Sequence, residues 1–297
     1  MAAGNTVTDS LADSIPTMIA SARIVREFAG VMPNLVDRQR LDENTGTVWN
    51  EVSMAKLTAQ AVTESTELDN PQQMEDTLFS ITPTVIGVHT VITDRVALRI
   101  SANAYAQTGS LAQNAIERKK DQDGLTVLDG ATTSLGTAGQ PLNSGEIAAA
   151  AYNITSNATE PAPASAPIHA VHHGFCLKDI DDELVSAGVD QTSGAPLTSG
   201  VAAETYQNRY RGTIAGARLY EDGNITIDSG DDAIGGVFSQ MAIVLVEGRS
   251  PYVETKRMPE LGGGATALYH YDEYAYGERS SGNWLYELKN DASTPTS

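Results

Sequence analysis

The stretch HAVHHGFCLKD, residues 169–179, contains three of the five histidines of the chain and its only cysteine. Four of its side chains are of the types that bind Zn(II): His169, His172, His173 and Cys176. On a helix these side chains would lie on one face and could converge on a single ion. A metal-dependent enzyme built around this cluster is therefore one hypothesis that the sequence raises.

The residues around the cluster favour a different local structure. The proline before it and the glycine within it interrupt a helix, and Ile168 and Val171 favour a strand. On a strand, His169 and His173 would share a face about 13 Å apart, and His172 would point the opposite way. No single metal joins ligands so far apart. We therefore expect one strand followed by a helix start. A histidine of this stretch at a subunit contact would make assembly sensitive to pH near 6.

Other candidate sites have structural interpretations. The acidic runs DIDDE (179–183) and DSGDD (228–232) lack the spacing of an EF-hand, and we expect a solvated helix start and a solvated loop. The DQDG segment at 121–124 is typical of a helix exit. Cys176, flanked by apolar residues, is expected to be a small buried hydrophobe. We expect no catalytic, cofactor-binding or metal-binding residues, and no enzymatic activity.

The composition is that of a globular protein with a strong acidic balance. The 297 residues are 41% hydrophobic and carry 19 basic and 38 acidic side chains, a net charge of −19. This charge disfavours sequence-specific nucleic-acid binding but is compatible with enclosing nucleic acid. No apolar run approaches the ~20 residues of a membrane helix, and the first residues lack the pattern of a secretory signal. A single cysteine cannot form an intramolecular disulfide, which fits assembly in a reducing cytoplasm.

The N-terminal part of the chain predicts extended and projecting elements. Residues 1–40 show no sustained core pattern, with only a short helical rhythm over 18–29. Residues 47–54 and 75–92 predict two strands, and Pro83 marks an edge or a twist in the second. The polar connector of about 20 residues between the strands is long for a hairpin inside a compact domain. We expect a projecting two-stranded loop.

The clearest predicted helix begins near Asp94 and ends at Gly124, with Leu98, Ala112 and Ile116 on its apolar face. At ~1.5 Å per residue it is ~40 Å long. The class is α+β, because strands and helices do not alternate regularly. The later predicted elements are a helix over 143–157 capped by Asn143 or Ser144, a strand and a short helix over 168–188, a helix over 203–210, strands with a turn at Asp222–Gly223, an apolar strand over 241–246 and two Tyr-rich strands joined by residues 277–282.

Four stretches, in this order, carry a resemblance to a known family. They are SMAKLTAQAVTESTELDNPQQM leading into ITPTVIGVHTVITDRVAL, LAQNAIERKKDQDGLTVLDGATT, IHAVHHGFCLKDIDDEL and RYRGTIAGARLYEDGNI. Together they resemble the tailed-bacteriophage major capsid protein of the HK97 fold. The first stretch resembles the extended E-loop of that family and its return into the long spine helix, and the second resembles the end of this helix. The third resembles the strand and helix of the family's axial domain, and the fourth resembles one of its strand pairs.

The resemblance implies an α+β, HK97-like chain of five segments. They are an N-terminal arm (1–47), an extended E-loop (48–87), a peripheral domain with a long spine helix (88–142), an axial domain (143–245), and C-terminal strands that return to both domains (246–297). It further implies that copies assemble into pentamers and hexamers of an icosahedral head around double-stranded DNA. The protein would be found in the virion, after assembly in the cytoplasm of a host bacterium.

The implied partners are other copies of the chain, a separate scaffold protein, a portal protein and a decoration protein, without a membrane or sequence-specific DNA binding. Only the short arm precedes the loop, which favours a separate scaffold over a fused one. Lys56 is the only lysine of the loop, and no cross-linking partner is matched by motif, so we expect a solvated charge. The alternatives are an encapsulin-like shell, the His/Cys metal-dependent enzyme and a secreted acidic binding module.

Overall fold

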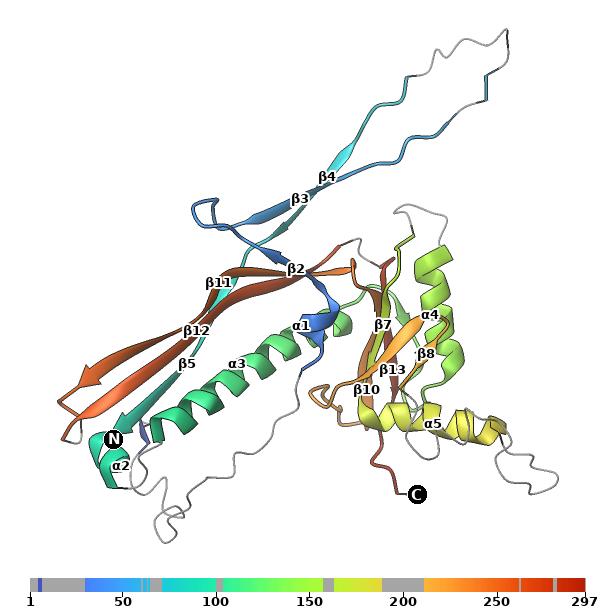
Figure 1. Cartoon of the computed structure of the whole chain (residues 1–297). Helices are drawn as coiled ribbons and strands as arrows, with labels where there is room; N and C mark the ends of the chain where they lie inside the picture. The colour runs from blue at the N-terminus through green and yellow to red at the C-terminus, as the bar shows by residue number, and fades with distance from the viewer. Residues whose placement is uncertain are drawn as a thin grey trace.

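The computed structural model contains two β-sheets, the helices that pack on them, and a two-stranded hairpin that projects away from both sheets (Figure 1). The structure describes residues 5–6, 30–59, 61–62, 64, 71–99, 104–156, 163–188, 211–261, 263–279 and 282–296. Strands and helices are mixed without regular alternation, so the predicted α+β class is confirmed. None of the described helices is long and apolar enough to span a membrane.

The longer sheet has five strands in the order β1-β5-β12-β11-β2. Its strands are β1 (Asn5–Thr6), β2 (Asp37–Arg40), β5 (Thr84–Thr93), β11 (Ile243–Met258) and β12 (Ala265–Glu278). β12 is antiparallel to both β5 and β11, and the two short edge strands are parallel to their neighbours. The turn between β11 and β12 uses Gly263 and Gly264 at φ values of 86° and 118°. Only glycine adopts such values without strain, which explains the glycine run there.

A long helix runs along one face of this sheet (Figure 1). α2 spans Asp94–Arg99 and α3 spans Ala104–Asp129. The predicted helix end at Gly124 is wrong, because α3 continues through it. A Cβ at Gly124 would lie 2.9 Å from Cβ of Met32 and 3.2 Å from the ring of Tyr276. This glycine therefore allows close packing and does not end the helix.

The contact between α3 and the sheet is partly polar. Lys120 places its ammonium 2.5 Å from a carboxylate oxygen of Glu247 and 3.6 Å from one of Asp272. The predicted apolar face is confirmed for Ile116, which is buried, and wrong for Leu98, which is exposed. The helix is thus positioned by a few apolar side chains and by a nearly buried ion pair, and not by a continuous apolar stripe.

The second sheet has six strands in the order β6-β13-β10-β7-β9-β8. Its strands are β6 (Ser134–Leu135), β7 (Ile168–His172), β8 (Thr213–Ile214), β9 (Ala217–Glu221), β10 (Asp232–Ser239) and β13 (Leu285–Asp291). α4 (Ser144–Ser156) packs on this sheet, α5 (Gly174–Gly188) lies at one end of it, and the end of α3 contacts β10 (Figure 1). Asn143 is confirmed as the cap of α4, because its side-chain oxygen accepts the backbone N–H of Glu146 at 2.9 Å.

The chain turns after Asp222, as predicted, with Gly223 and Asn224 in the turn, but this turn does not join two strands of a hairpin. The turn between β8 and β9 uses Ala215 and Gly216, at φ values of 47° and 86°. Positive φ at both central positions fits the right-handed twist of the strands that they join. Asp222 and Gly223 follow β9 without opening a hairpin.

Residues 240–242 carry the chain from the six-stranded sheet to the five-stranded sheet. The apolar strand predicted over 241–246 therefore begins only at Ile243, and it continues to Met258. The two Tyr-rich strands form as predicted, but β12 and β13 lie in different sheets and do not pair. The five predicted segments stay a prediction, because a change of sheet does not define an independently folding unit.

The last part of the predicted arm belongs to the core. α1 (Met32–Leu35) is a short helix whose two end residues are buried, and β2 pairs with β11. The sequence shows no sustained core pattern over residues 1–40, and yet the apolar side chains of α1 pack into the main core. The helices predicted over 18–29 and 203–210 lie outside the described residues.

Candidate functional site

The projecting hairpin exposes apolar side chains on one of its faces. β3 (Trp49–Met54) and β4 (Asp76–Ile81) are antiparallel, which confirms the predicted two-stranded loop. Val52 lies directly opposite Leu78, and their exposed fractions are 52% and 62%. Met54, two residues from Val52 and thus on the same face, is also exposed. A two-stranded hairpin is marginally stable alone, and this one leaves an apolar pair uncovered by the rest of the subunit.

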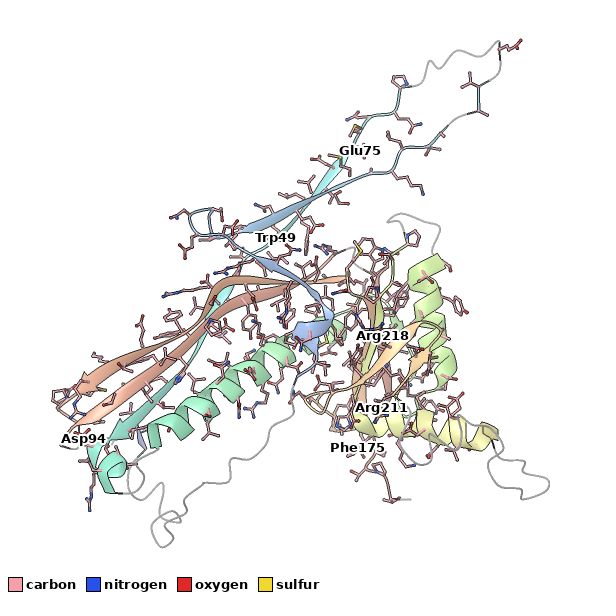
Figure 2. The ribbon with its side chains drawn as sticks, in the orientation of Figure 1. Trp49, Glu75, Asp94, Phe175, Arg211 and Arg218 are labelled. Carbon is pink, nitrogen blue, oxygen red and sulfur yellow. The ribbon has the colours of Figure 1, made fainter. Side chains whose placement is uncertain are left out.

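The opposite face of the hairpin anchors it to the body of the protein. Figure 2 shows Trp49 where the hairpin leaves the sheets and Glu75 on its projecting part. The rings of Trp49 and Phe79 meet edge to face, with 6.2 Å between centroids. Ile81 is buried with residues of β11, and a Cβ at Gly277 would lie 2.6 Å from its side chain. These apolar contacts fix the base of the hairpin against the sheet.

Arg279 joins the hairpin to three other segments. Its guanidinium lies 2.8 Å from a carboxylate oxygen of Asp37 in β2 and 2.7 Å from one of Glu51 in β3. It also donates to the backbone carbonyl of Met241, and it lies 6.0 Å from the ring centroid of Trp49. Only 11% of this side chain is exposed, so these bonds are strong for an ion pair near the surface. No sequence signal identified Arg279.

The face of the five-stranded sheet opposite α3 carries a row of aromatic rings. His89 stacks on Tyr269 at 4.4 Å between centroids, and Tyr271 lies next to Tyr269 at 6.2 Å. Tyr252 of β11 lies 5.2 Å from Tyr271, and the guanidinium of Arg249 covers Tyr252 at 3.6 Å. This row forms a half-exposed aromatic surface on that face of the sheet.

The histidine-rich stretch is a strand and a helix start, as predicted. His169 lies in β7, buried against the rings of Tyr220 and Phe238. His172 points to the other face and fills the space that Gly235 leaves, since a Cβ there would lie 2.3 Å from its Nδ1. Burial lowers the pKa of each of the two histidines to about 4. In the single subunit His169 therefore does not titrate near pH 6, and a subunit contact at His169 or His173 stays a prediction.

The two other members of the cluster do not join these histidines. Nδ1 of His173 accepts the backbone N–H of Phe175 at 3.2 Å, at the start of α5. Cys176 is buried, as predicted, and burial raises the pKa of its thiol to about 12. A thiol with this pKa is not a nucleophile at neutral pH. No group of three or more metal-binding side chains occurs within the part of the chain that the structure describes.

The acidic run at 179–183 lies inside α5, which begins at Gly174, so the prediction of a helix start is wrong for this run. The carboxylate of Glu183 accepts the backbone N–H of Ser144 at 2.8 Å and its hydroxyl at 2.6 Å. The run therefore joins the start of α4 to α5.

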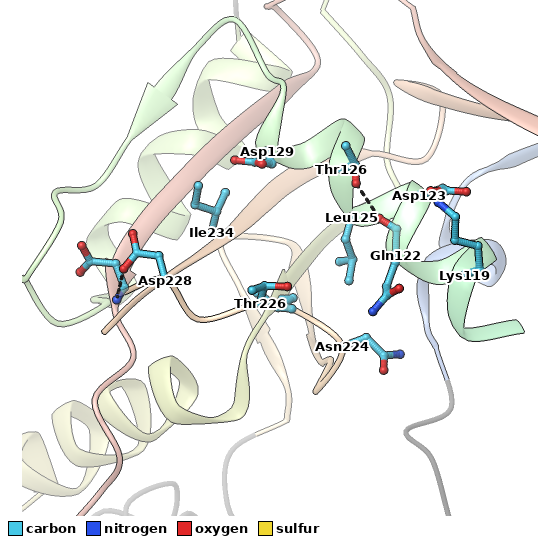
Figure 3. Close-up of a pocket in the computed structure, with 12 residues that line it drawn as sticks. Lys119, Gln122, Asp123, Leu125, Thr126, Asp129, Asn224, Thr226, Asp228 and Ile234 are labelled. Carbon is cyan, nitrogen blue, oxygen red and sulfur yellow. Dashed lines mark hydrogen bonds and ion pairs between the residues drawn. The ribbon is translucent and has the colours of Figure 1, made fainter. Parts of the chain in front are cut away.

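A cavity of about 470 Å³ lies between the last turns of α3 and the loop that leads into β10 (Figure 3). Asp228, in the predicted solvated loop, is exposed and pairs with Lys289 at 2.8 Å. Its bond to Lys289 and the two backbone N–H groups that it accepts lower its pKa to about 2. Asp232 of the same run is buried, and it accepts the backbone N–H of Gly139 at 2.7 Å. Both carboxylates already accept hydrogen bonds from backbone N–H groups or pair with Lys289, so neither is available to bind a ligand in the cavity.

Comparison with known proteins adds the decisive observation. No protein-family model matches the chain, and no curated protein matches it in sequence. Solved structures match it over nearly its whole length. The cyanophage Pam1 capsid matches with a TM-score of 0.70 and 12% identity, over 99% of this chain and 100% of that chain. The chain has the fold of phage capsid proteins.

Two further structures have this capsid fold. The capsid of the cyanophage P-SCSP1u matches with a TM-score of 0.69 and 12% identity, over 98% of this chain and 96% of that chain. The head of the Helicobacter pylori bacteriophage KHP40 matches with a TM-score of 0.68 and 11% identity, over 93% and 95%. The resemblance predicted from the sequence is therefore confirmed for the fold. At such identities, no residue role passes from these structures to this chain.

Proposed function

We propose that the chain is a major capsid protein, and that its copies form the pentamers and hexamers of an icosahedral phage head around double-stranded DNA. The observation that carries this proposal is the match to phage capsid structures over 93–99% of the chain. The protein then acts as a structural component of the virion, without enzymatic activity, and assembles in the cytoplasm of a bacterial host.

The described elements supply the parts that such a shell needs. The β3–β4 hairpin acts as the E-loop and lies over a neighbouring subunit, which covers Val52 and Leu78. α3 acts as the spine helix of a peripheral domain, together with the five-stranded sheet. The six-stranded sheet with α4 and α5 acts as the axial domain, near the centre of each pentamer or hexamer. An isolated subunit leaves the hairpin uncovered, which is why assembly is favourable.

The net charge of −19 fits a container that does not bind its contents tightly. Double-stranded DNA is enclosed without tight or sequence-specific contacts, because the acidic surface disfavours the cationic phosphate contacts that supply most of the affinity for nucleic acid. A separate scaffold protein, a portal protein and a decoration protein complete the particle. An encapsulin-like shell would contain protein cargo, so the nucleic-acid content of particles from infected cells separates the two functions.

The hairpin contact is tested by Val52→Asp, with Ser53→Asp as the matched control. Both variants add one carboxylate to β3, but Ser53 lies on the other face of the strand. Covering one Val side chain contributes about 2 kcal/mol, which corresponds to a change of roughly 30-fold in the association constant of each subunit contact. We expect V52D to stay folded and fail to form shells, and S53D to form them. Normal shells from V52D, measured by light scattering, would contradict the hairpin contact.

A further inference from the structure

Two carboxyl groups lie buried against one another where the N-terminal segment meets the rest of the protein. Asp121, in the middle of α3, is 0% exposed, and Asp222, just after β9, is 1% exposed. The two carboxyl groups lie side by side, because Asn224 donates to both of them and the adjacent residues Val31 and Met32 donate to one each. Their sequence neighbours suggested a helix exit and a turn, so neither residue stood out in the sequence.

The pair binds the root of the N-terminal segment through its backbone. Asp121 accepts the backbone N–H of Met32 at 3.0 Å, and Asp222 accepts that of Val31 at 3.4 Å. The backbone of Gly30 packs directly on Asp121, since a Cβ at this glycine would lie 2.3 Å from the carboxyl carbon. Residues 30–32 are thus held against α3 and against the segment that leaves the six-stranded sheet.

Asn224 completes the arrangement. Its backbone N–H donates to Asp222 at 2.8 Å, and its side-chain amide donates to Asp121 at 2.9 Å. The backbone N–H of Asp222 donates in turn to the carbonyl of His172 in β7. Three parts of the chain that lie far apart in sequence therefore meet at one pair of acids.

The charges around the pair do not neutralise it. No ion pair joins Asp121 or Asp222 to a basic side chain among the described residues. The buried hydroxyl of Tyr276 in β12 is near enough to Asp121 to be affected by its charge, and the other charges that act on this hydroxyl are Arg38 in β2, Asp123 in α3 and Glu247 in β11. Two of these three charges are negative. Two adjacent buried carboxylates would repel one another strongly, and burial together with the charge of Asp121 raises the pKa of Asp222.

We propose that Asp222, which keeps its proton beside the buried Asp121, forms a latch with it that holds residues 30–32 on α3 and on the six-stranded sheet and loosens when that proton is lost. The latch gives the root of the N-terminal segment a pH-dependent attachment. It rests on this buried pair and does not depend on the capsid function.

The direction of the pH effect follows from the environment of Asp222. Burial, followed by the effect of Asp121, raises the pKa of Asp222 to about 7. In an opened latch the carboxyl is solvated and its pKa returns to about 3.9. The closed form therefore binds the proton more tightly, and closure weakens as the pH rises towards and through 7. Between pH 6 and pH 8 the ratio of open to closed forms rises about tenfold.

Hydrogen exchange in the full-length protein tests the latch. The N–H of Met32 donates to Asp121, so its protection reports the opening directly. We expect its protection factor, corrected for the intrinsic effect of pH on exchange, to fall about tenfold from pH 6 to pH 8. In Asp222→Asn the amide replaces the protonated acid, so this change should shrink to less than twofold. Asp129→Asn removes an exposed carboxylate from the same helix and should behave as the wild type.

A wild-type protection factor that does not change with pH, or an unchanged tenfold effect in D222N, would overturn the proposal. If D222N does not fold, the infrared spectrum of the wild type decides the question. A carbonyl band of a protonated carboxylic acid that disappears between pH 6 and pH 8 supports the retained proton, and the absence of such a band over this range refutes it.

Discussion

Removal of the Arg279 side chain tests how the hairpin is held. Arg279→Ala leaves two carboxylates, Asp37 and Glu51, without their shared partner, and removes a donor to a backbone carbonyl. A hydrogen bond to a charged group contributes about 1.5–3 kcal/mol. The two carboxylates are 29% and 37% exposed, so solvent screening reduces each contribution. We expect R279A to lower the free energy of unfolding by about 2–3 kcal/mol.

The assay is urea unfolding of the unassembled full-length protein, combined with hydrogen exchange of β3 and β4. Exchange in the hairpin should accelerate more than exchange in the main core, because Arg279 holds the base of the hairpin. Arg257→Ala is the matched control: Arg257 also pairs with a carboxylate, but 54% of its side chain is exposed, and its loss should lower the stability far less than R279A does. Equal effects of R279A and R257A on stability and on hairpin exchange would refute the anchoring role.

Two further predictions concern pH and packing. In the unfolded chain His169 and His172 gain a proton near pH 6.5, whereas in the folded protein both stay neutral down to about pH 4. Each histidine should therefore lower the free energy of unfolding by roughly 2 kcal/mol between pH 7 and pH 5. Asp222 opposes this loss, because its pKa of about 7 in the folded state lies above the ordinary value. The free energy of unfolding of D222N, measured by urea titration, should therefore fall more steeply with decreasing pH than that of the wild type. Gly124→Ala should lower the free energy of unfolding by about 1–2 kcal/mol because the new methyl group is overpacked, whereas Gly130→Ala, with its nearest neighbour at 3.4 Å, should not. Equal melting temperatures for these two variants would contradict the packing explanation.

Local patterns predicted the elements whose form depends on their own residues. The strands of the hairpin, the interruption at Pro83, the cap at Asn143, and the strand and helix of the histidine-rich stretch follow from residue types and spacing. The overall order of elements was enough to indicate the capsid fold. Even without a conserved motif, such an order restricts the possible architectures.

Features that depend on tertiary contacts were not predictable in this way. Gly124 resembles a helix end because glycine is costly inside a helix, and only the approach of Met32 explains its presence there. Asp121 and Asp222 resemble surface acids, and their burial arises from elements more than 80 residues apart, since the bond between Asp121 and Met32 spans 89 positions. Arg279 has no distinguishing neighbour in sequence. Its role exists only because β2, β3 and β12 meet at one point.

Electron microscopy of the expressed full-length protein tests the central claim most directly. The account predicts closed shells built of pentamers and hexamers, in which the β3–β4 hairpin of each subunit covers part of a neighbour. Deletion of residues 55–74 should leave the two sheets folded and prevent these shells from forming. A protein that stays monomeric at high concentration, or shells in which the hairpin contacts no other subunit, would contradict it.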